Sequence, residues 1–255
     1  MKSDLGLKPL SARSVILSAL LGSHPPRLPA RALVALGSQF GIAEGTVRTA
    51  LSRMVDSGEV EASGSTYRLG ARLRRRQESQ EIALHVLDES WDGSWWISIV
   101  DVVGRPMAAR RAYRATMLEH RLGELRPDTW LRPTNLPAPP SDEGAFVARG
   151  EVTDRAAEQL AAQLWDLDAV ASHAKRLLEL AEHACTSLAP GNPSALADSF
   201  LVSVATVRFL RSEPQLPRRI VGDAWPADQL RSTYGRLERA YATVLAAFVA
   251  EKAAL

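Results

Sequence analysis

Apolar and polar positions alternate with a helical period between Ala43 and Gly58. The apolar positions fall three or four residues apart, which is the spacing of one buried helical stripe. Gly41 precedes the segment, and Gly58 follows it where a left-handed helix cap forms. The pattern therefore predicts a short amphipathic helix. Its apolar stripe consists of Val47, Ala50, Leu51, Met54 and Val55, and its polar face of Arg48, Thr49, Ser52 and Arg53.

The role of this helix is open from its own residues. A face of arginines and hydroxyl groups suits contact with DNA phosphates and base edges. A solvated helix face of a globular protein can have the same composition. The choice between the two depends on the flanking segments.

The flanking segments complete a known arrangement. Residues 11–21 predict a first helix with Ser11 as its N-cap, and a second helix is expected from Pro29 to about Phe40. The runs 60–62 and 66–69 enclose a turn and predict a β-hairpin. Three helices and a hairpin predict a winged helix-turn-helix in residues 1–70, whose third helix enters the DNA major groove. The alternative is a winged helix that contacts a protein partner.

The rest of the chain predicts two further domains. Residues 71–90 are expected to form an Arg-rich linker helix, which either reaches phosphates or is solvated. Residues 91–165 predict a central ferredoxin-like α+β domain, with a fourth strand that the pattern does not locate. Residues 166–255 predict a C-terminal helical domain, so the fold class is multidomain α+β. In the central domain we expect strands at 97–103, 129–131 and 145–148 and helices at 105–123 and 154–164, with Ala109, Tyr113, Met117 and His120 toward the core. In the C-terminal domain we expect helices at 168–188, at 194–210 and from Pro226 onward.

Composition limits the function classes. The chain has 255 residues, 46% of them hydrophobic, and a net charge of +2, so a nucleic-acid surface must be local. Cys185 is the only cysteine, which excludes an internal disulfide and fits a reducing compartment. The histidines show no metal-ligand spacing, so we expect neither a metal nor a cofactor. No apolar run reaches the length of a membrane span, and we expect a cytoplasmic protein.

Three places in the chain, and a fourth, shorter motif, resemble the PaaX family of bacterial transcriptional regulators, named for repressors of phenylacetate catabolism. The run 46–55, TVRTALSRMV, is close to the family's recognition-helix wording VRTALSRLV. WDGSW at 91–95 is similar to its WDGxW. The segments EPQLP at 213–217 and DAWP at 223–226 match its C-terminal pattern, and WDL at 165–167 fits its LWDL. The resemblance extends over nearly the whole chain.

The resemblance implies a homodimer on a palindromic DNA operator, released by an acyl- or aryl-coenzyme A effector such as phenylacetyl-CoA. Two departures concern the third helix. Ala43 stands where a capping serine is usual, at a cost on the order of 1 kcal/mol. Gly45 adds about 0.5–1 kcal/mol relative to alanine. Elsewhere, Ala227 replaces the glycine of the family's WPG, and the wing is less basic and aromatic than in typical members.

Two sets of candidate site residues follow. We expect DNA contacts from the third helix and the wing, and effector contacts from a basic cluster beside tryptophans that could hold the phosphates and rings of a coenzyme A thioester. The alternative for the second set is a solvated helix with core tryptophans. The DNA set is Thr46, Arg48, Thr49, Ser52, Arg53, Tyr67 and Arg68; the effector set is Trp95, Trp96, Arg105, Arg110, Arg111, Arg114 and Trp130.

An enzymatic role rests on Asp101 alone. It lies at the end of the first strand expected in the central domain, where the small nuclease fold to which the family resemblance points keeps a metal-binding aspartate. A lone aspartate is a weak magnesium site, because Mg²⁺ normally takes further oxygen ligands. No Ser/His/Asp set or phosphate loop is present. We therefore expect a regulator that is not an enzyme, with a metal-dependent nuclease and a protein-interaction module as alternatives.

Overall fold

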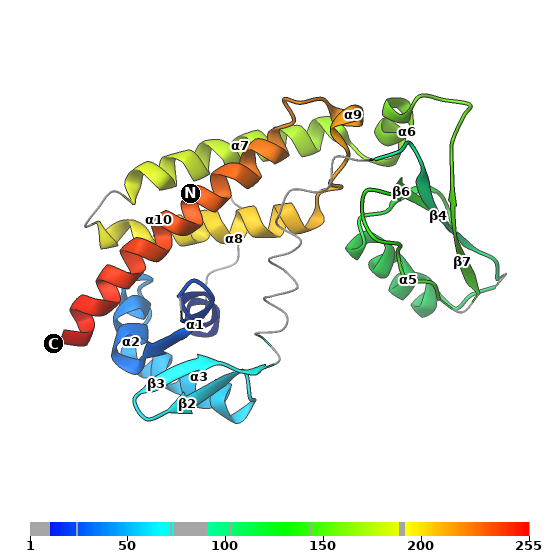
Figure 1. Ribbon diagram of the computed structural model, residues 1–255. Helices are drawn as coiled ribbons and strands as arrows, with labels where there is room; N and C mark the ends of the chain where they lie inside the picture. Colours follow the sequence, from blue (N-terminus) through cyan, green and yellow to red (C-terminus); the bar gives the residue numbers. More distant parts are fainter. Residues whose placement is uncertain are drawn as a thin grey trace. The chain divides into compact units, whose positions relative to one another are not determined.

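The computed structural model describes residues 11–23, 25–71, 73, 91–102, 104–142, 144–188 and 192–254 (Figure 1). These residues divide into two compact units. The first comprises the described residues up to 73 together with 177–208 and 230–254, and the second comprises 91–176 and 209–229. The predicted α+β class is confirmed. The predicted linker helix at 71–90 lies outside the described residues except for positions 71 and 73.

The N-terminal part of the first unit has the element order of a winged helix-turn-helix. Its sheet is antiparallel with strand order β1-β3-β2. The strand β1 was not predicted, because a three-residue strand ending in proline has the composition of a loop. The elements are α1 (Ala12–Leu21), β1 (Arg27–Pro29), α2 (Ala30–Gln39), α3 (Glu44–Asp56), β2 (Val60–Ser63) and β3 (Thr66–Leu69).

Local chemistry explains these boundaries. The Ser11 side chain accepts a hydrogen bond from the Ser14 N–H at 3.2 Å and caps α1 as predicted. Gly41 and Gly58 have φ of 70° and 69°, so both turns around α3 use the left-handed region. Gly37 on α2 lets α3 approach closely, because a Cβ there would lie 2.6 Å from Val47 Cγ2.

The predicted stripe of α3 is its buried face, with one refinement. Val47, Leu51 and Met54 are at most 2% exposed. Ala50 and Val55, at the edges of the stripe, are half-buried. The stripe packs against α1 and α2, which leaves the opposite side of α3 at the surface.

Long helices follow in the C-terminal half: α7 (Leu167–Ser187), α8 (Leu196–Ser212) after the 3₁₀ turn η1 (Pro193–Ala195), and α10 (Pro226–Ala254). They were predicted within a few residues, whereas the short helix α9 (Arg218–Val221) was not. Within the first unit, Phe40 at the end of α2 meets Phe200 of α8 edge-on at 5.5 Å, and Phe200 in turn meets Tyr241 of α10 at 6.3 Å.

One stretch in the described part of the chain, Pro193–Ser212, has the length and apolar composition of a membrane span. Its most apolar window is 56% buried inside the protein. Phe200, Leu201 and Leu210 are each at most 5% exposed. The stretch therefore has the burial of a core helix.

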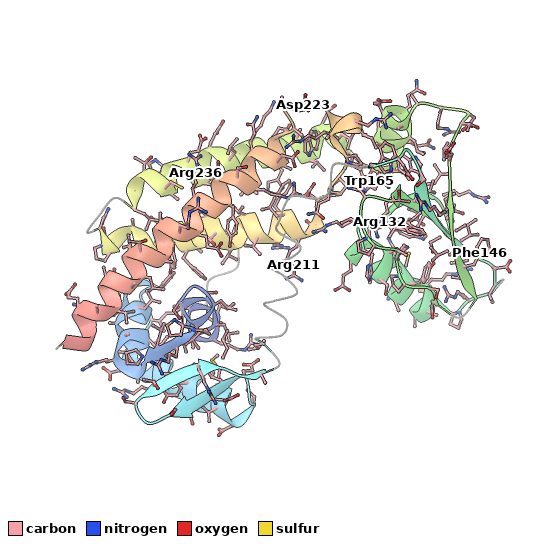
Figure 2. All side chains as sticks on the ribbon, in the orientation of Figure 1. Arg132, Phe146, Trp165, Arg211, Asp223 and Arg236 are labelled. Atoms are coloured by element: carbon pink, nitrogen blue, oxygen red, sulfur yellow. The ribbon has the colours of Figure 1, made fainter. Side chains whose placement is uncertain are left out.

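The second unit contains the central α+β domain. Its four strands are antiparallel in the order β5-β6-β4-β7, the order of a ferredoxin-like sheet. The second helix of the domain, α6, follows the last strand, β7, whereas in a ferredoxin-like fold it precedes that strand. The elements are β4 (Trp95–Val100), α5 (Met107–Glu119), β5 (Gly123–Arg126), β6 (Thr129–Pro133), β7 (Ala145–Gly150) and α6 (Ala157–Leu164). Figure 2 labels Phe146 on the edge strand β7 and Arg132 on β6.

Helices cover both faces of this sheet. On one face Tyr113 and Met117 of α5 pack with Trp130. On the other face Trp95 and Leu131 pack with α6 and α9, in a cluster that also includes Leu160, Leu164, Leu216 and Ile220. The signature tryptophans Trp91 and Trp95 meet edge-on at 5.9 Å in that second cluster.

Two details of the predicted central domain were wrong. The helix expected over 105–123 is shorter and ends at Glu119, because Pro106 precedes it and Gly123 begins β5, the fourth strand. His120 is exposed at the end of α5 instead of facing the core. Tyr113 and Met117 do face the core as predicted, and Ala109 is half-buried.

Candidate nucleic-acid interface

The polar side of α3 is at the surface. Every residue of the predicted contact set on this helix is exposed: Thr46, Arg48, Thr49, Ser52 and Arg53. The buried stripe on the other side fixes the helix to α1 and α2, so these side chains point away from the domain core. The structure thus brings the predicted set onto one accessible surface, which could enter a DNA groove.

A groove runs beside this face. It has a volume of about 680 Å³ and lies between the start of α1 and α3. Its α3 side includes Gly45, Thr46, Thr49 and Arg53, and its other side includes Ser11 and Arg13. Arg13 is therefore a basic residue beside the predicted contact set that the sequence pattern did not indicate.

Glutamates form ion pairs with three of the five arginines on and around this face. Arg48 Nε donates to Glu44 Oε1 at 2.7 Å, one helical turn away, with both side chains about 60% exposed. Arg68 Nε donates to Glu61 Oε2 at 2.9 Å across the wing. Arg13 Nε donates to Glu59 Oε2 at 2.8 Å, and this hydrogen bond raises the pKa of Arg13. In the part of the chain that the structure describes, the side chains of Arg53 and of Arg27 on β1 make no ion pair or hydrogen bond.

The wing presents its two predicted residues differently. On β3, Arg68 lies opposite Glu61 of β2 and opposite Arg27 of β1 in the register of the sheet. Its side chain is 53% exposed. Tyr67 lies one position away, so it shares a face with the buried Leu69 and is half-buried. Of the two, Arg68 is the more accessible to a ligand.

The N-terminus of α3 is bare. Ala43 is its N-cap and makes no side-chain hydrogen bond. No atom lies within 4 Å of where a Cβ of Gly45 would be, so this end of the helix has free space around its backbone. Thr49 Oγ1 donates back to the Gly45 carbonyl at 2.8 Å. Free N–H groups at a helix N-terminus attract a phosphate oxygen.

The predicted effector residues are spread over the central domain. Arg105 donates to Asp142 at 2.6 Å and lies over the Tyr113 ring, and Arg114 pairs with Glu124 over the Trp130 ring. Trp95 and Trp130 are 1% and 2% exposed and belong to two different clusters. Trp96 donates to the Leu136 carbonyl at 3.0 Å, and Arg110 and Arg111 are exposed on α5. The assignment of these residues to an effector stays a prediction.

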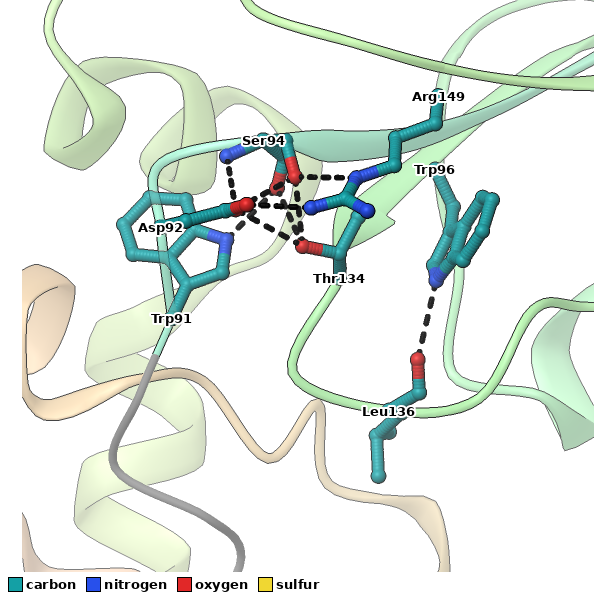
Figure 3. Close-up of polar contacts among 7 residues, drawn as sticks. All are labelled: Trp91, Asp92, Ser94, Trp96, Thr134, Leu136 and Arg149. Atoms are coloured by element: carbon teal, nitrogen blue, oxygen red, sulfur yellow. Dashed lines mark hydrogen bonds and ion pairs between the residues drawn. The ribbon is translucent and has the colours of Figure 1, made fainter.

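The WDGSW segment forms a polar network that the sequence did not predict (Figure 3). The Asp92 carboxylate accepts from the Ser94 hydroxyl at 2.6 Å and from the Ser94 N–H at 3.0 Å, and it pairs with Arg149. Arg149 Nε also donates to Ser94 Oγ at 3.0 Å. The hydrogen bonds from Ser94, followed by the charge of Arg149, hold the pKa of Asp92 at about 2. The network ties the start of β4 to β7.

Asp101 stands apart from other metal-binding side chains. It is exposed after β4, and its N–H donates to the Gly144 carbonyl at 2.8 Å. Among the residues that the structure describes, no three His, Cys, Asp or Glu side chains lie close enough to hold a metal ion.

Comparison with known proteins gives consistent matches at both ends of the chain. Residues 11–73 match a family described as PaaX-like protein, and residues 165–251 match the PaaX-like protein C-terminal domain. A solved structure of the uncharacterized protein Rv0674 from Mycobacterium tuberculosis is similar, with 36% identity and a TM-score of 0.79. The match covers 93% of this chain and 98% of that one. No protein with a curated description matches the chain.

Proposed function

Because this chain belongs to the PaaX-like family, we propose that it is a transcriptional regulator that binds double-stranded DNA through α3. The observation that carries the proposal is the exposed polar face of α3 in a winged helix-turn-helix. In this arrangement the third helix lies in the major groove and the wing runs along the backbone. Arg48 and Arg53 are the candidates for guanine, since an arginine reads guanine by two parallel hydrogen bonds.

The arginine–glutamate pairs favour sequence-specific DNA binding over binding without sequence preference. Binding without sequence preference depends on the number of phosphates that Lys and Arg neutralise. Here Glu44, Glu59 and Glu61 offset Arg48, Arg13 and Arg68, which leaves Arg53 and Arg27 as the unpaired cations among the described residues on and around this face. Affinity must then come from base contacts on a matched site.

The finer parts of the proposal concern the assembly and its control. We propose a homodimer on a palindromic operator, which acts as a repressor in the cytoplasm and is released by an acyl- or aryl-coenzyme A effector. The exposed Arg110 and Arg111 on α5 would meet the effector's phosphates. The support for these parts is the family resemblance.

A footprint of the full-length protein on the promoter of its own gene cluster tests the proposal. We expect protection of two half-sites whose centres lie one helical turn of DNA, or a multiple of it, apart, because a two-fold dimer places two copies of α3 on one side of the duplex. Addition of phenylacetyl-CoA should remove the protection. A uniform pattern with no protected sequence at any protein concentration would contradict DNA reading by α3, whereas protection of a single half-site would contradict only the dimer.

A further inference from the structure

Two arginines in the second unit have buried Nε atoms and form no ion pair with the residues that the structure describes. Arg132 on β6 is 3% exposed (Figure 2), and Arg121, directly after α5, is half-buried with φ of 62°. Neither makes an ion pair with any residue that the structure describes. Charged side chains are rarely buried unless they are paired. This pair is therefore a feature that neither the packing of the sheet nor the DNA-binding face requires.

Neutral oxygens satisfy only part of these guanidinium groups. Arg121 donates to the Gln215 side chain and, at 3.0 Å, to the Leu210 carbonyl. Arg132 donates to the Pro137 carbonyl. The Nε atoms of both arginines are buried and have no hydrogen-bond partner among the described residues. Two donor groups therefore remain unsatisfied, and no carboxylate among the described residues forms an ion pair with either arginine.

Further basic groups add to the positive field. Burial, and then the charge of Arg211 at the end of α8, lowers the pKa of Arg121 to about 10. Burial, and then Arg121, lowers the pKa of Arg132 to about 10. The pKa of His120, which is only partly shielded from solvent, is lowered by that partial desolvation and by the charge of Arg132, with Glu119 acting in the opposite direction. The C-terminal end of α5 supplies only a partial negative charge.

We propose that Arg121 and Arg132 bind a small oxyanion, the carboxylate or phosphate group of a ligand of the central domain. A guanidinium group presents its N–H donors in a planar fork that matches both of these groups. An oxyanion would neutralise the charge that burial makes costly and would accept from the unused Nε–H groups. The site lies wholly within the second unit, so the proposal does not depend on DNA binding by α3.

The proposal is tested with the full-length protein and two probes, inorganic phosphate and acetate, against chloride at constant ionic strength. We expect at least one probe to raise Tm in a saturable manner, because a ligand that binds only the folded state stabilises it. Arg132→Gln should lose the response and weaken the probe's affinity in calorimetry at least tenfold. Arg126→Gln, at an exposed arginine of β5, should keep it. A response to phosphate alone points to a phosphate ligand, and a response to acetate alone to a carboxylate.

NMR titration of His120 supplies a second readout. A bound anion offsets the charge of Arg132, so the pKa of His120 should rise in the responding anion and stay unchanged in the Arg132→Gln variant. If that variant does not fold, Arg121→Gln takes its place. The same saturable Tm increase in wild type and variant, or no increase with either probe, would overturn the proposal.

Discussion

Glu44 shows how one residue alters the chemistry of the candidate DNA-binding face. The sequence pattern emphasised the arginines of α3, but Glu44 lies one turn before Arg48 and accepts from it at 2.7 Å. This pair was visible in the sequence, since Glu and Lys or Arg four residues apart on a helix attract each other. The Arg13–Glu59 pair joins residues 46 positions apart and could be found only from the fold.

Glu44→Gln should raise the affinity for DNA of unrelated sequence about two- to fivefold at low salt, because one more cation becomes available to phosphates. The salt dependence of that binding should become steeper. Fluorescence anisotropy with a random duplex at several salt concentrations measures both quantities. Glu158→Gln on α6 serves as the control and should change neither. Weaker non-specific binding by Glu44→Gln would show instead that the carboxylate helps to hold Arg48 toward DNA.

Asp92 is the residue whose structural role the motif alone could not reveal. Its hydrogen bonds from Ser94 hold its pKa at about 2, below the ordinary value of 3.8. The stabilisation that follows from a lowered carboxylate pKa is fully present above pH 4 and is lost as the pH falls toward 2. The WDGSW segment therefore supports the central domain by an ionised carboxylate.

We expect Asp92→Asn to lower Tm at pH 7 and to flatten the fall of Tm between pH 5 and pH 2, because the amide does not ionise. Thermal unfolding followed by circular dichroism across this range measures the effect. Asp223→Asn is the matched control, since Asp223 is exposed and makes no hydrogen bond or ion pair with the described residues. Parallel pH profiles for wild type and Asp92→Asn would contradict the role assigned to the network.

At the scale of elements, the sequence predicted those helices and strands whose own residues specify them. Ser11 caps α1, Gly41 and Gly58 end the turns around α3, and the apolar stripe of α3 faces its neighbours. The two strands that were missed, β1 and β5, have weak local signals. β1 ends in proline, and β5, Gly-Glu-Leu-Arg, lacks β-branched and aromatic residues. Pairing with β3 and β6 determines their conformation.

Two glycines near α3 should respond in opposite ways to alanine. Gly37→Ala places a Cβ 2.6 Å from Val47 Cγ2, and we expect the free energy of unfolding to fall by about 1–2 kcal/mol because α2 and α3 must separate. Gly45→Ala meets open space and should raise it by about 0.5–1 kcal/mol. Urea denaturation of both variants measures the difference. Equal changes of the same sign would contradict the close packing of α2 on α3.

At the scale of the whole molecule, the local arrangement of charged side chains says more about binding than the overall composition does. A net charge of +2 does not indicate a nucleic-acid binder, and Arg48, Arg68 and Arg13, on and beside the α3 face, are paired with glutamates. The candidate DNA face was predictable because one helix carries nearly all of it. The charge of Arg121 acting on Arg132 was not, since the two residues are eleven positions apart and are brought near each other only by the fold of the central domain.

The contacts of Gln215 explain one motif of the C-terminal half, the EPQLP segment at 213–217. Gln215 of the EPQLP segment is 2% exposed, accepts from Arg121 with its side chain, and accepts from Asn135 with its carbonyl at 2.8 Å. Through these hydrogen bonds of Gln215, residues 213–217 are held against the central domain within the second unit. The motif in the sequence identified residues 213–217 as a unit, but it did not show which side chains of the central domain they contact.

The central claim, that α3 reads DNA, is tested most directly by the affinity of Arg48→Ala for the footprinted operator, measured by anisotropy beside Arg126→Ala. An arginine–guanine pair contributes about 1–3 kcal/mol of discrimination. We predict at least tenfold weaker operator binding for Arg48→Ala, an unchanged Tm, and wild-type affinity for Arg126→Ala. Wild-type operator affinity in a folded Arg48→Ala protein would contradict the placement of this helix in the groove.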